Sequence, residues 1–446
     1  MSVAFARLRR VRLADCSVTE RAALVERSAS ASSDVREGAR AIVDEVRRGG
    51  DAALRAANAR FGGGLAPSAG VPAPLRVSAT ELAAARDALP DVLRDALLAM
   101  ARNIEAFHAV QVPPREQWVQ VAPGIRVGRA WRALDRVGAY VPGGEASYPS
   151  SLLMSAIPAR LAGVRELVVA SPAGRDGRVS TALLGAAGLM GVDEFYAMGG
   201  AQAIGALAHG TESIGPVDRI VGPGNAWVTA AKLEVLGTTS IDFPAGPSEV
   251  MVLADGTAEP AHVAADLLSQ AEHGPDSAAV LVTTSPVLAD AVEAEVARQL
   301  PALPRQAFLQ ASLASAGLVV EAADLDEALD FVNAYAPEHL SIVVARDDRA
   351  FAAVRHAGSV FLGAWAPESA GDYATGSNHV LPTGRLARAY GALGVESFGK
   401  WVQVQRVTRE GLAAIRHTVA VVAEAEGLTA HRRAVDIRFE MGDAAP

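Results

Sequence analysis

Short runs of apolar residues alternate with alanine-rich segments along most of the chain after residue 130. ELVVASP (166–172) has the length and composition of a buried strand, and TALLGAAGLMG (181–191) is typical of a helix that ends at glycine. The alternation returns with a strand expected at SEVMVLAD (248–255) and a helix at PAHVAADLLSQAEH (260–273). Strands that alternate with helices at this spacing form βαβ units around a parallel sheet. The pattern predicts an α/β fold with two doubly wound, Rossmann-like sheets in α/β/α layers.

The two ends of the chain lack this alternation and are predicted to be helical. Residues 1–60 are charged and alanine-rich, and residues 79–111 continue as helix with Thr80 as N-cap. From about residue 393 the main element is the helical run REGLAAIRHTVAVVAEAEGL. We therefore expect helical N- and C-terminal extensions around the two sheets.

Composition and charge exclude several classes of protein. The formal net charge of −9 and the absence of a long basic tract argue against a nucleic-acid partner, and the RLRR run at 7–10 is better explained as a solvated or subunit-contact face. The single cysteine, Cys16, excludes an internal disulfide and a cysteine-rich metal site. Lys232 and Lys400 are the only lysines, and neither lies in a setting typical of a nucleophile. No apolar run reaches the roughly 18 residues of a membrane span or marks a signal peptide, so we expect a cytoplasmic protein with no membrane partner.

Four of the nine histidines lie in short polar runs that also carry a carboxylate or an amide. Nitrogen and oxygen ligands without sulfur suit a borderline cation, above all zinc. The pairs are Gln270 with His273, Glu338 with His339, Asp372 with His379, and Glu426 with His431.

Gln270 and His273 are expected on one face at the end of a helix, because they are three residues apart. Alone this spacing is a weak signal, and a surface or capping role is the common alternative. Polar neighbours at Glu272, Asp276 and Ser277 crowd the following glycine turn. We therefore expect the pair at the edge of a sheet where α/β proteins usually bind ligands.

Glu338 and His339 follow a proline in a helix-to-strand connection, where both can border one cleft. A carboxylate beside an imidazole is a natural acid/base pair, although a capping glutamate and a hydrogen-bonded buried histidine explain it equally well.

The segment 367–383 is long, polar and glycine-rich, and carries Glu368 as well as Asp372 and His379. Such a loop after a buried strand is more often functional than structural. Glu426 and His431 by themselves look like an ordinary helix end.

The sequence contains neither G-x-G-x-x-G nor G-x-x-x-x-G-K-[ST]. Glycines instead follow expected strands at AYVPGG (139–144), MGGAQAIG (198–205) and GPGNAW (222–227). Backbone N–H groups and helix N-termini at such turns can bind phosphate, but similar turns are common without any ligand.

Eight motifs, in order over nearly the whole chain from about residue 30, together resemble the histidinol dehydrogenase family. They are RVGAYVPGG, MGGAQAIGALA, VDRIVGPGNAWVTAAK, DFPAGPSEVMVLAD, DLLSQAEHGPDS, NAYAPEHL, ESAGDYATGSNHVLPT and EGLTAHRRAV. The resemblance implies oxidation of L-histidinol to L-histidine, the last step of histidine biosynthesis, by two successive NAD molecules through bound L-histidinaldehyde. It also implies one zinc ion per subunit and a homodimer with shared active sites.

Site residues follow from the resemblance motif by motif. The implied zinc ligands are Gln270, His273, Asp372 and, from the other subunit, His431; these residues, with Ser248, His339, His379 and Glu426, would also contact the substrate. The implied acid/base pair is Glu338 and His339, and the implied NAD contacts are Tyr140, Gln202 and Asn225. Ser377 replaces an expected threonine and the sequence around Lys400 is looser than usual, but neither departure touches a proposed ligand.

Four regions are expected from these assignments: an N-terminal helical arm (1–35), an α/β domain with most zinc and catalytic residues (36–139 and 247–392), an α/β NAD-contacting domain (140–246), and a helical tail (393–446) that contributes to the partner's site.

The absence of cysteine from the four polar runs agrees with the chemistry that the resemblance implies. Many enzymes oxidise aldehydes through a cysteine thiohemiacetal, but Cys16 lies outside every polar cluster. A hydrated aldehyde that loses hydride, with His339 as base and Glu338 activating water, fits such a site. Zinc would serve as a template that grips the imidazole and amine of the substrate.

Two alternatives remain. A related zinc/NAD enzyme could oxidise another polar alcohol such as a hydroxysulfonate, although the carboxylate of Glu426 suits a cationic amine and would repel a sulfonate. A non-catalytic sensor of histidinol or NAD would not need the pair of Glu338 and His339. Turnover of NAD with histidinol separates both alternatives from the dehydrogenase.

Overall fold

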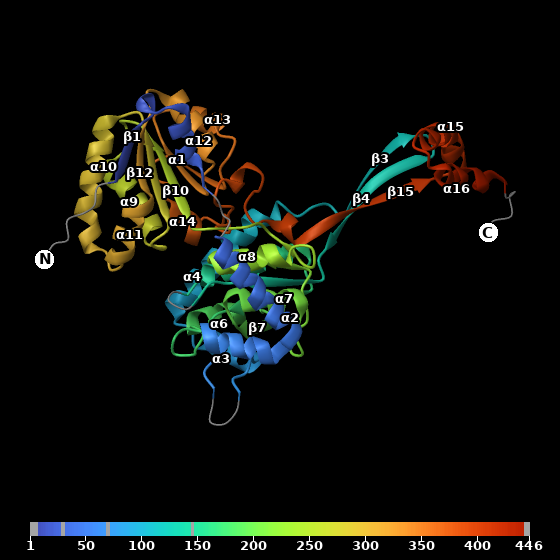
Figure 1. Ribbon diagram of the computed structural model, residues 1–446, viewed down its shortest axis with the longest axis horizontal. Coiled ribbons are helices and arrows are strands. Elements are labelled where there is room, and N and C mark those ends of the chain that lie inside the picture. The colour runs from blue at the N-terminus through green and yellow to red at the C-terminus, as the bar shows by residue number, and fades with distance from the viewer. Residues whose placement is uncertain (1–7, 28–31, 68–71, 144–146, 441–446) are drawn as a thin grey trace. The chain divides into compact units, whose positions relative to one another are not determined.

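The computed structural model describes residues 8–27, 32–67, 72–143 and 147–440, and the chain divides into two compact units (Figure 1). The first unit comprises Met1–Gln111 and Leu134–Phe398, and the second comprises Val112–Ala133 and Gly399–Pro446. Within the described residues, no helix is both long and apolar enough to cross a membrane.

The first sheet lies in the first unit and has the strand order β2-β7-β6-β5-β8-β9. Its strands run parallel except β2, which pairs antiparallel with β7. Counted along the chain from β5, the parallel strands have the order 3-2-1-4-5, which defines a doubly wound sheet. The strands are β2 (Arg76–Val77), β5 (Arg136–Tyr140), β6 (Glu166–Ser171), β7 (Glu194–Ala197), β8 (Arg219–Val221) and β9 (Ser240–Ile241).

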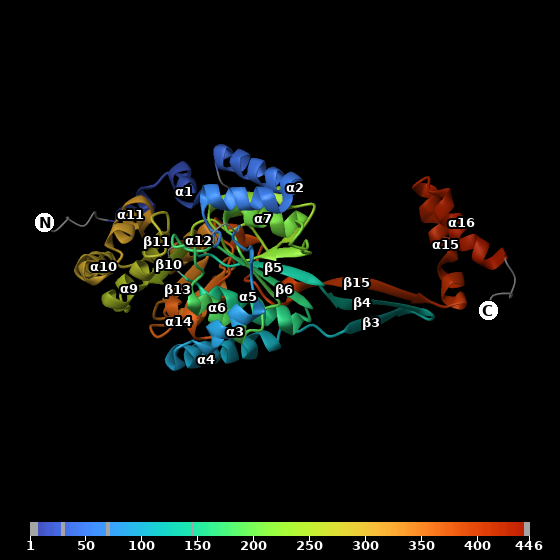
Figure 2. The same cartoon turned by 90° about the horizontal axis from the view of Figure 1, so that it is seen from below.

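Helices lie on both faces of the first sheet, with α2 and α7 on one face and α3, α4, α5 and α6 on the other (Figure 2). Helices α7 and α8 both pack against α2, and their buried alanine, valine and leucine side chains form one core. The helices are α2 (Ser33–Phe61), α3 (Ala79–Asp87), α4 (Asp91–Ala109), α5 (Pro149–Ala162), α6 (Thr181–Leu189), α7 (Gly200–His209) and α8 (Ala226–Val235).

The second sheet also lies in the first unit, and all of its strands are parallel in the order β1-β12-β11-β10-β13-β14. Counted from β10, five of its strands repeat the order 3-2-1-4-5 of the first sheet. The predicted fold class of two doubly wound sheets is therefore confirmed. The strands are β1 (Arg9–Arg12), β10 (Glu249–Ala254), β11 (Ala278–Thr283), β12 (Gly317–Glu321), β13 (His339–Val343) and β14 (Ser359–Leu362).

Alternate residues of β10 face two different cores, one on each side of the second sheet. Val250 and Val252 pack in the core that includes α9, whereas Met251 and Leu253 pack in the core that includes α12. A strand covered on both faces needs this continuous apolar run. The surrounding helices are α1 (Val18–Val25), α9 (Pro260–Ala271), α10 (Pro286–Gln299), α11 (Gln306–Ala316), α12 (Leu325–Tyr335), α13 (Asp347–Ala353) and α14 (Glu368–Tyr373), with short 3-10 turns at Leu13–Asp15, Leu300–Ala302, Leu386–Arg388 and Val395–Phe398.

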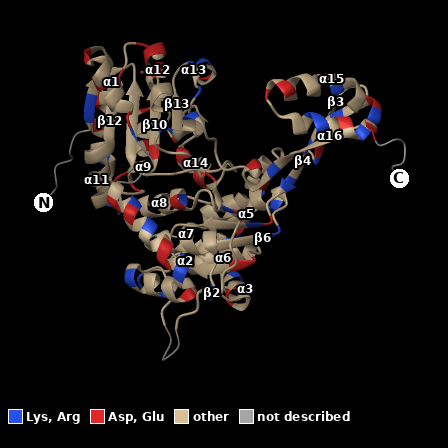
Figure 3. Ribbon diagram, turned by 45° about the vertical axis from the view of Figure 1, so that its right-hand side comes forward, with Lys and Arg blue, Asp and Glu red and all other residues tan. Residues whose placement is uncertain are grey.

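The second unit contains an antiparallel sheet of order β15-β4-β3 and two helices that contact each other. Acidic and basic residues are interspersed along α16, as they are along α2 of the first unit (Figure 3). The elements are β3 (Glu116–Ala122), β4 (Ile125–Ala133), β15 (Gly399–Val407), α15 (Arg409–Ala425) and α16 (Thr429–Glu440).

The termini are partly extended rather than wholly helical. Arg9–Arg12 forms the edge strand β1 beside β12, and Gly399–Val407 pairs along its full length with β4. Both strands are rich in polar residues, as exposed edges often are, and this composition conceals them in the sequence.

The predicted grouping of 36–139 with 247–392 does not follow the division into sheets, since β2 and β5 belong to the first sheet with residues 166–241. The domain boundaries as such stay a prediction.

Candidate active site

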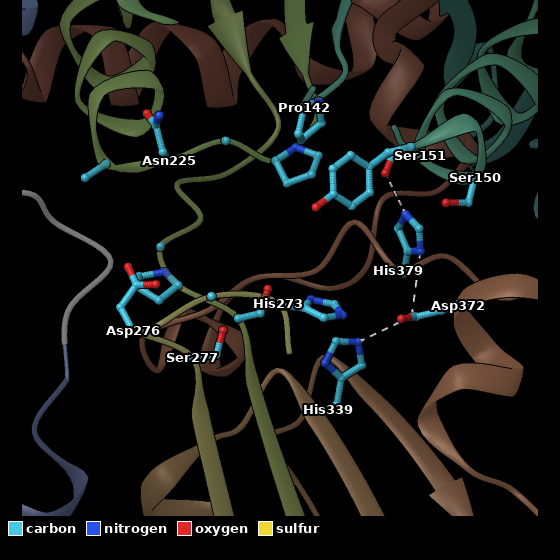
Figure 4. Close-up of a pocket in the computed structure, with 18 of the residues that line it drawn as sticks. Pro142, Ser150, Ser151, Asn225, His273, Asp276, Ser277, His339, Asp372 and His379 are labelled. Carbon is cyan, nitrogen blue, oxygen red and sulfur yellow. Dashed lines mark hydrogen bonds and ion pairs between the residues drawn. The ribbon is translucent and has the colours of Figure 1, made fainter. Parts of the chain in front are cut away.

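A cavity of about 550 Å³ lies in the first unit and is lined by residues that come from both sheets (Figure 4). Its histidines are His273, His339 and His379, which lie near the carboxylate of Asp372 (Figure 4). The first-sheet half of the wall includes Pro142, Ser150, Ser151, Pro223, Gly224 and Asn225, and the other half includes Ser248, Asp276, Ser277 and Tyr373.

His339 is the first residue of β13, directly beside β10 in the second sheet. Its Nδ1 lies 3.1 Å from the carbonyl oxygen of Glu249. Because a carbonyl can only accept, Nδ1 carries the hydrogen and Nε2 keeps a free lone pair. Nε2 has no hydrogen-bond partner among the described residues. Burial lowers the pKa of His339 to about 3, so the ring is neutral at pH 7 and its Nε2 lone pair is unprotonated.

The backbone conformation of the residues before Glu338 and His339 determines where β13 begins. Helix α12 ends at Tyr335, and the C-cap residue Ala336 is fully buried and adopts the left-handed conformation with φ 53°. A non-glycine residue in this region is strained, and such strain tends to occur beside functional sites. Pro337 follows and turns the chain away from the helix, so that Glu338 directly precedes β13 and His339 begins it.

Glu338 is buried, and its Oε2 accepts a hydrogen bond of 2.7 Å from the backbone N–H of Glu249. The same oxygen lies 3.6 Å from Nδ1 of His339. Burial raises the pKa of Glu338 well above its ordinary value. The N–H and the carbonyl of Glu249 therefore hold Glu338 and His339 respectively. Among the described residues, Glu338 is not part of the cavity wall.

A potential metal-binding group comprises His339, Glu368 and Asp372, whose ligand atoms lie within 4.8 Å of one another. Glu368 and Asp372 lie on the short helix α14 that follows β14. Burial raises the pKa of Asp372 to about 7 and that of Glu368 well above its ordinary value. A bound cation would favour the ionised form of both groups and so offset this cost. The sequence predicts a polar loop at Glu368 and assigns this residue no role. The only signal that could have identified it is its spacing from Asp372 on the same helix.

Gln270 is fully buried on the last turn of α9, and neither atom of its side-chain amide has a hydrogen-bond partner among the described residues. A buried amide without partners is costly, and such groups usually mark a missing ion, water or ligand. His273 follows on the cavity wall, where the residue is exposed; partial desolvation by its surroundings lowers its pKa and keeps its ring nitrogens available as ligands. These two residues and Asp372 are three of the four predicted zinc ligands, and their donor atoms suit zinc.

The other predicted substrate contacts divide between the two units. Ser248 and His379 line the cavity; Nε2 of His379 lies 2.9 Å from Oγ of Ser151, and its Nδ1 lies 3.7 Å from Oδ1 of Asp372. Burial lowers the pKa of His379 to about 4. Glu426 and His431 belong to the second unit, where both are exposed, and the cavity wall contains neither.

The position of these residues on the second sheet differs from the sequence interpretation. Ser248 precedes β10, His273 precedes β11 and His339 begins β13, so all three lie at the amino ends of their strands. The rule for α/β proteins places ligands at the carboxyl ends. The expected edge for Gln270 and His273 was therefore wrong, because their loop leads into a strand and does not leave one.

The predicted cofactor contacts lie at the carboxyl ends of the first sheet. A second cavity of about 470 Å³ is lined there by Tyr140, Gln202 and Asn225, and Asn225 also borders the larger cavity. The hydroxyl of Tyr140 accepts a bond of 3.2 Å from the backbone of Gly200, and burial raises its pKa to about 12. Gln202 is buried and donates to Asn58 at 3.3 Å, so its amide is held in one orientation.

Two doubly wound sheets and a cavity whose wall carries three histidines and the carboxylate of Asp372 define an α/β protein with side chains suited to catalysis. The family model of histidinol dehydrogenase matches residues 25–439. The chain belongs to the histidinol dehydrogenase family.

Individual relatives agree with this assignment. The histidinol dehydrogenase of Methanothermobacter thermautotrophicus is 48% identical over 409 residues, which cover 92% of this chain and 94% of the relative. That of Halobacterium salinarum is 47% identical and covers 96% of this chain and 98% of the relative. The crystal structure of histidinol dehydrogenase from Elizabethkingia anophelis superposes with a TM-score of 0.90 at 37% identity, covering 97% of this chain and 98% of that one.

Proposed function

We propose that the protein oxidises L-histidinol to L-histidine with two molecules of NAD, through L-histidinaldehyde that stays bound, as the last step of histidine biosynthesis in the cytoplasm. One observation carries the proposal: in the cavity, a neutral His339 keeps Nε2 free beside buried groups suited to a metal ion. Family membership supports the substrate.

His339 is assigned as the base for both oxidations. Its Nε2 takes the proton of the alcohol in the first and of the hydrated aldehyde in the second, while the carbonyl of Glu249 holds Nδ1–H and fixes the tautomer. Ser248 and His379 are assigned to orient the substrate. Glu338 is assigned to promote the addition of water to the aldehyde; its contact with the Glu249 N–H keeps its carboxyl beside the His339 ring.

Zinc is proposed to be held by Gln270, His273, Asp372 and His431 of the partner subunit. The amide of Gln270, which lacks partners among the described residues, and the raised pKa of Asp372 each fit a bound cation. The ion supplies a Lewis-acid template for the imidazole and amine of the substrate. NAD, near Tyr140, Gln202 and Asn225, supplies the hydride acceptor.

The decisive experiment is NADH formation from L-histidinol, measured before chelation, after chelation and after zinc is restored. We expect two NADH per histidinol, loss of turnover on chelation and recovery with zinc; manganese or cobalt should also restore part of it. A hydroxysulfonate serves as the rival substrate. Preference for it, or binding of histidinol without any NADH, would replace the proposed activity by the related alcohol dehydrogenase or by a sensor.

The shared site is tested by mixing two inactive chains. We propose a homodimer in which Glu426 and His431 of one subunit complete the cavity of the other, since both are exposed on the second unit. A His431→Ala chain mixed with a His339→Ala chain should form hybrid dimers that regain one intact site. Absence of recovery after confirmed subunit exchange would show that His431 acts within its own chain.

A further inference from the structure

Lys232 is a buried cation that the proposed chemistry does not use. It lies on α8 with a relative exposure of 1%, and it is one of only two lysines in the chain. A lysine is almost never buried to this extent unless its ammonium group is fully paired. The partners of Lys232 therefore indicate its role.

The ammonium group of Lys232 makes three hydrogen bonds. It donates to the carboxylate of Asp242, to the carbonyl of Gly222 at 3.0 Å and to the carbonyl of Phe243 at 3.1 Å. An ammonium group has three hydrogens, so all of its donors are satisfied. Asp242 in turn accepts from the N–H of Gly222 at 2.8 Å and from that of Phe243 at 2.7 Å.

These bonds fix the turn that carries Asn225. Both backbone groups of Gly222 are held, one by Lys232 and the other by Asp242. Gly222 has φ +108°, and a Cβ there would lie 2.1 Å from the carbonyl oxygen of Tyr140, so the turn passes tightly over the end of β5. Asn225 follows three residues later, caps α8 and borders both cavities.

The same bonds fix the segment that leads to Ser248. Lys232 holds the carbonyl of Phe243, and Thr229, one turn earlier on α8, donates to the carbonyl of Ala245. Gly246, Pro247 and Ser248 then form part of the wall of the larger cavity. One face of α8 therefore holds both the turn on the cofactor side and the segment on the substrate side.

We propose that Lys232 is a positioning residue that keeps the turn of Asn225 and the segment of Ser248 in register, so that the cofactor and the alcohol meet in reacting geometry. The kinetic part of this inference rests on the proposed function. Misplacement of reacting groups by about 1 Å can cost about 10²-fold in rate. No chemical group of the cavity is altered when Lys232 is replaced.

Two variants test the role of Lys232. Lys232→Met removes the three donors but leaves Asp242 as an unpaired buried carboxylate, which can prevent folding. The double variant Lys232→Met with Asp242→Asn avoids that charge and keeps one of the two acceptors, because the single amide oxygen can accept from the N–H of Gly222 or from that of Phe243. The matched control is Lys400→Met, since Lys400 is the only other lysine and is exposed in the second unit.

Kinetics give the first readout. In the double variant we expect kcat per folded molecule to fall by about 10²-fold, KM for both NAD and histidinol to rise, and the pH profile of kcat to keep its shape because His339 is untouched. Thr229→Val should raise KM for histidinol alone. Unchanged kcat and KM in folded double variant would overturn the proposal.

Hydrogen exchange gives a second readout that needs no activity. Peptides over 222–228 and 243–248 should both exchange at least about tenfold faster in the double variant, whereas Thr229→Val should affect only the second. Equal acceleration throughout the first unit would mean general destabilisation and would also overturn the proposal. If the unaltered protein produces no NADH from histidinol, the proposed function fails, and the exchange pattern alone decides on Lys232.

Discussion

The first and second sheets share the strand order 3-2-1-4-5, but their candidate ligand-binding residues lie at opposite ends. In the first sheet, Tyr140 ends β5 and Asn225 follows β8, so both lie at the carboxyl ends. In the second sheet, Ser248 and His339 lie at the amino ends of β10 and β13. Strand order specifies where a crevice can open, but the loops decide which edge carries the chemistry.

At the carboxyl edge of the second sheet, hydrogen bonds occupy the switch point between β10 and β13, where a ligand would otherwise bind. Asp255 follows β10 there, and its carboxylate accepts from the N–H of Thr257 at 2.9 Å and from that of Ala345, after β13, at 2.9 Å. Asp255 also donates its own N–H to Val343. These bonds join the ends of the two strands between which a doubly wound sheet usually binds its ligand.

The largest effect is expected at the amino edge of the second sheet. His339→Asn removes the free Nε2 and should lower the rate of both half-reactions by about 10²–10⁴-fold, the usual value of a positioned base. Single-turnover NADH formation from histidinol and from supplied histidinaldehyde measures each half-reaction. His417→Asn, on α15 of the second unit, is the control. Retention of either half-reaction by His339→Asn would show that another group is the base.

Glu338→Gln should separate the two half-reactions. Its carboxyl is assigned to water addition, so oxidation of supplied histidinaldehyde should slow by about 10²-fold or more, and the first hydride transfer much less. The same single-turnover assay applies. Equal losses in both half-reactions would make Glu338 a structural partner of the Glu249 N–H, a role that its absence from the described cavity wall also suits.

Asp372 should make the metal-free protein less stable as the pH rises. Its folded pKa is about 7 against an ordinary 3.8, so its contribution is fully present below about pH 3.8 and is lost as the pH rises through 7. Between pH 5 and pH 8 the loss should be about 2–3 kcal/mol. Urea unfolding of chelated protein and of Asp372→Asn isolates this term, because the histidines contribute equally to both. An identical pH slope in the two proteins would contradict the buried carboxyl, and zinc should reverse the loss at pH 8.

The smallest effect is expected at the carboxyl edge of the first sheet. Gln202→Leu removes one polar contact and should raise KM for NAD about five- to tenfold with little change in kcat, as loss of a single hydrogen bond does. Steady-state kinetics at saturating histidinol measures it, with Gln299→Leu on α10 as the control. A fall in kcat with unchanged KM would place Gln202 in the chemical step.

Periodicity predicted the central architecture well, because strands buried on both faces are continuous apolar runs. It missed β1 and β15, whose arginine, lysine and glutamine residues conceal edge strands. The resemblance supplied the candidate site, of which His273, His339, Asp372 and His379 line one cavity in the first unit, whereas Gln270 is buried on α9 and is not among the residues of that wall. The wrong edge for Gln270 and the unassigned Glu368 have one cause: both depend on how the helices α9 and α14 are oriented, which a one-dimensional pattern does not give.

Because Val250 pairs with His339, the activity of the protein depends on the register between β10 and β13. Successive residues of a strand face opposite sides, so a slip of β13 by one position would turn His339 away from the cavity and exchange its place with that of Glu338. A chain that is compact and has full secondary structure, but in which β13 pairs with β10 in the wrong register, would be inactive. Active-site titration therefore counts correctly registered molecules, and comparison with total protein would report the fidelity of refolding, which circular dichroism does not resolve.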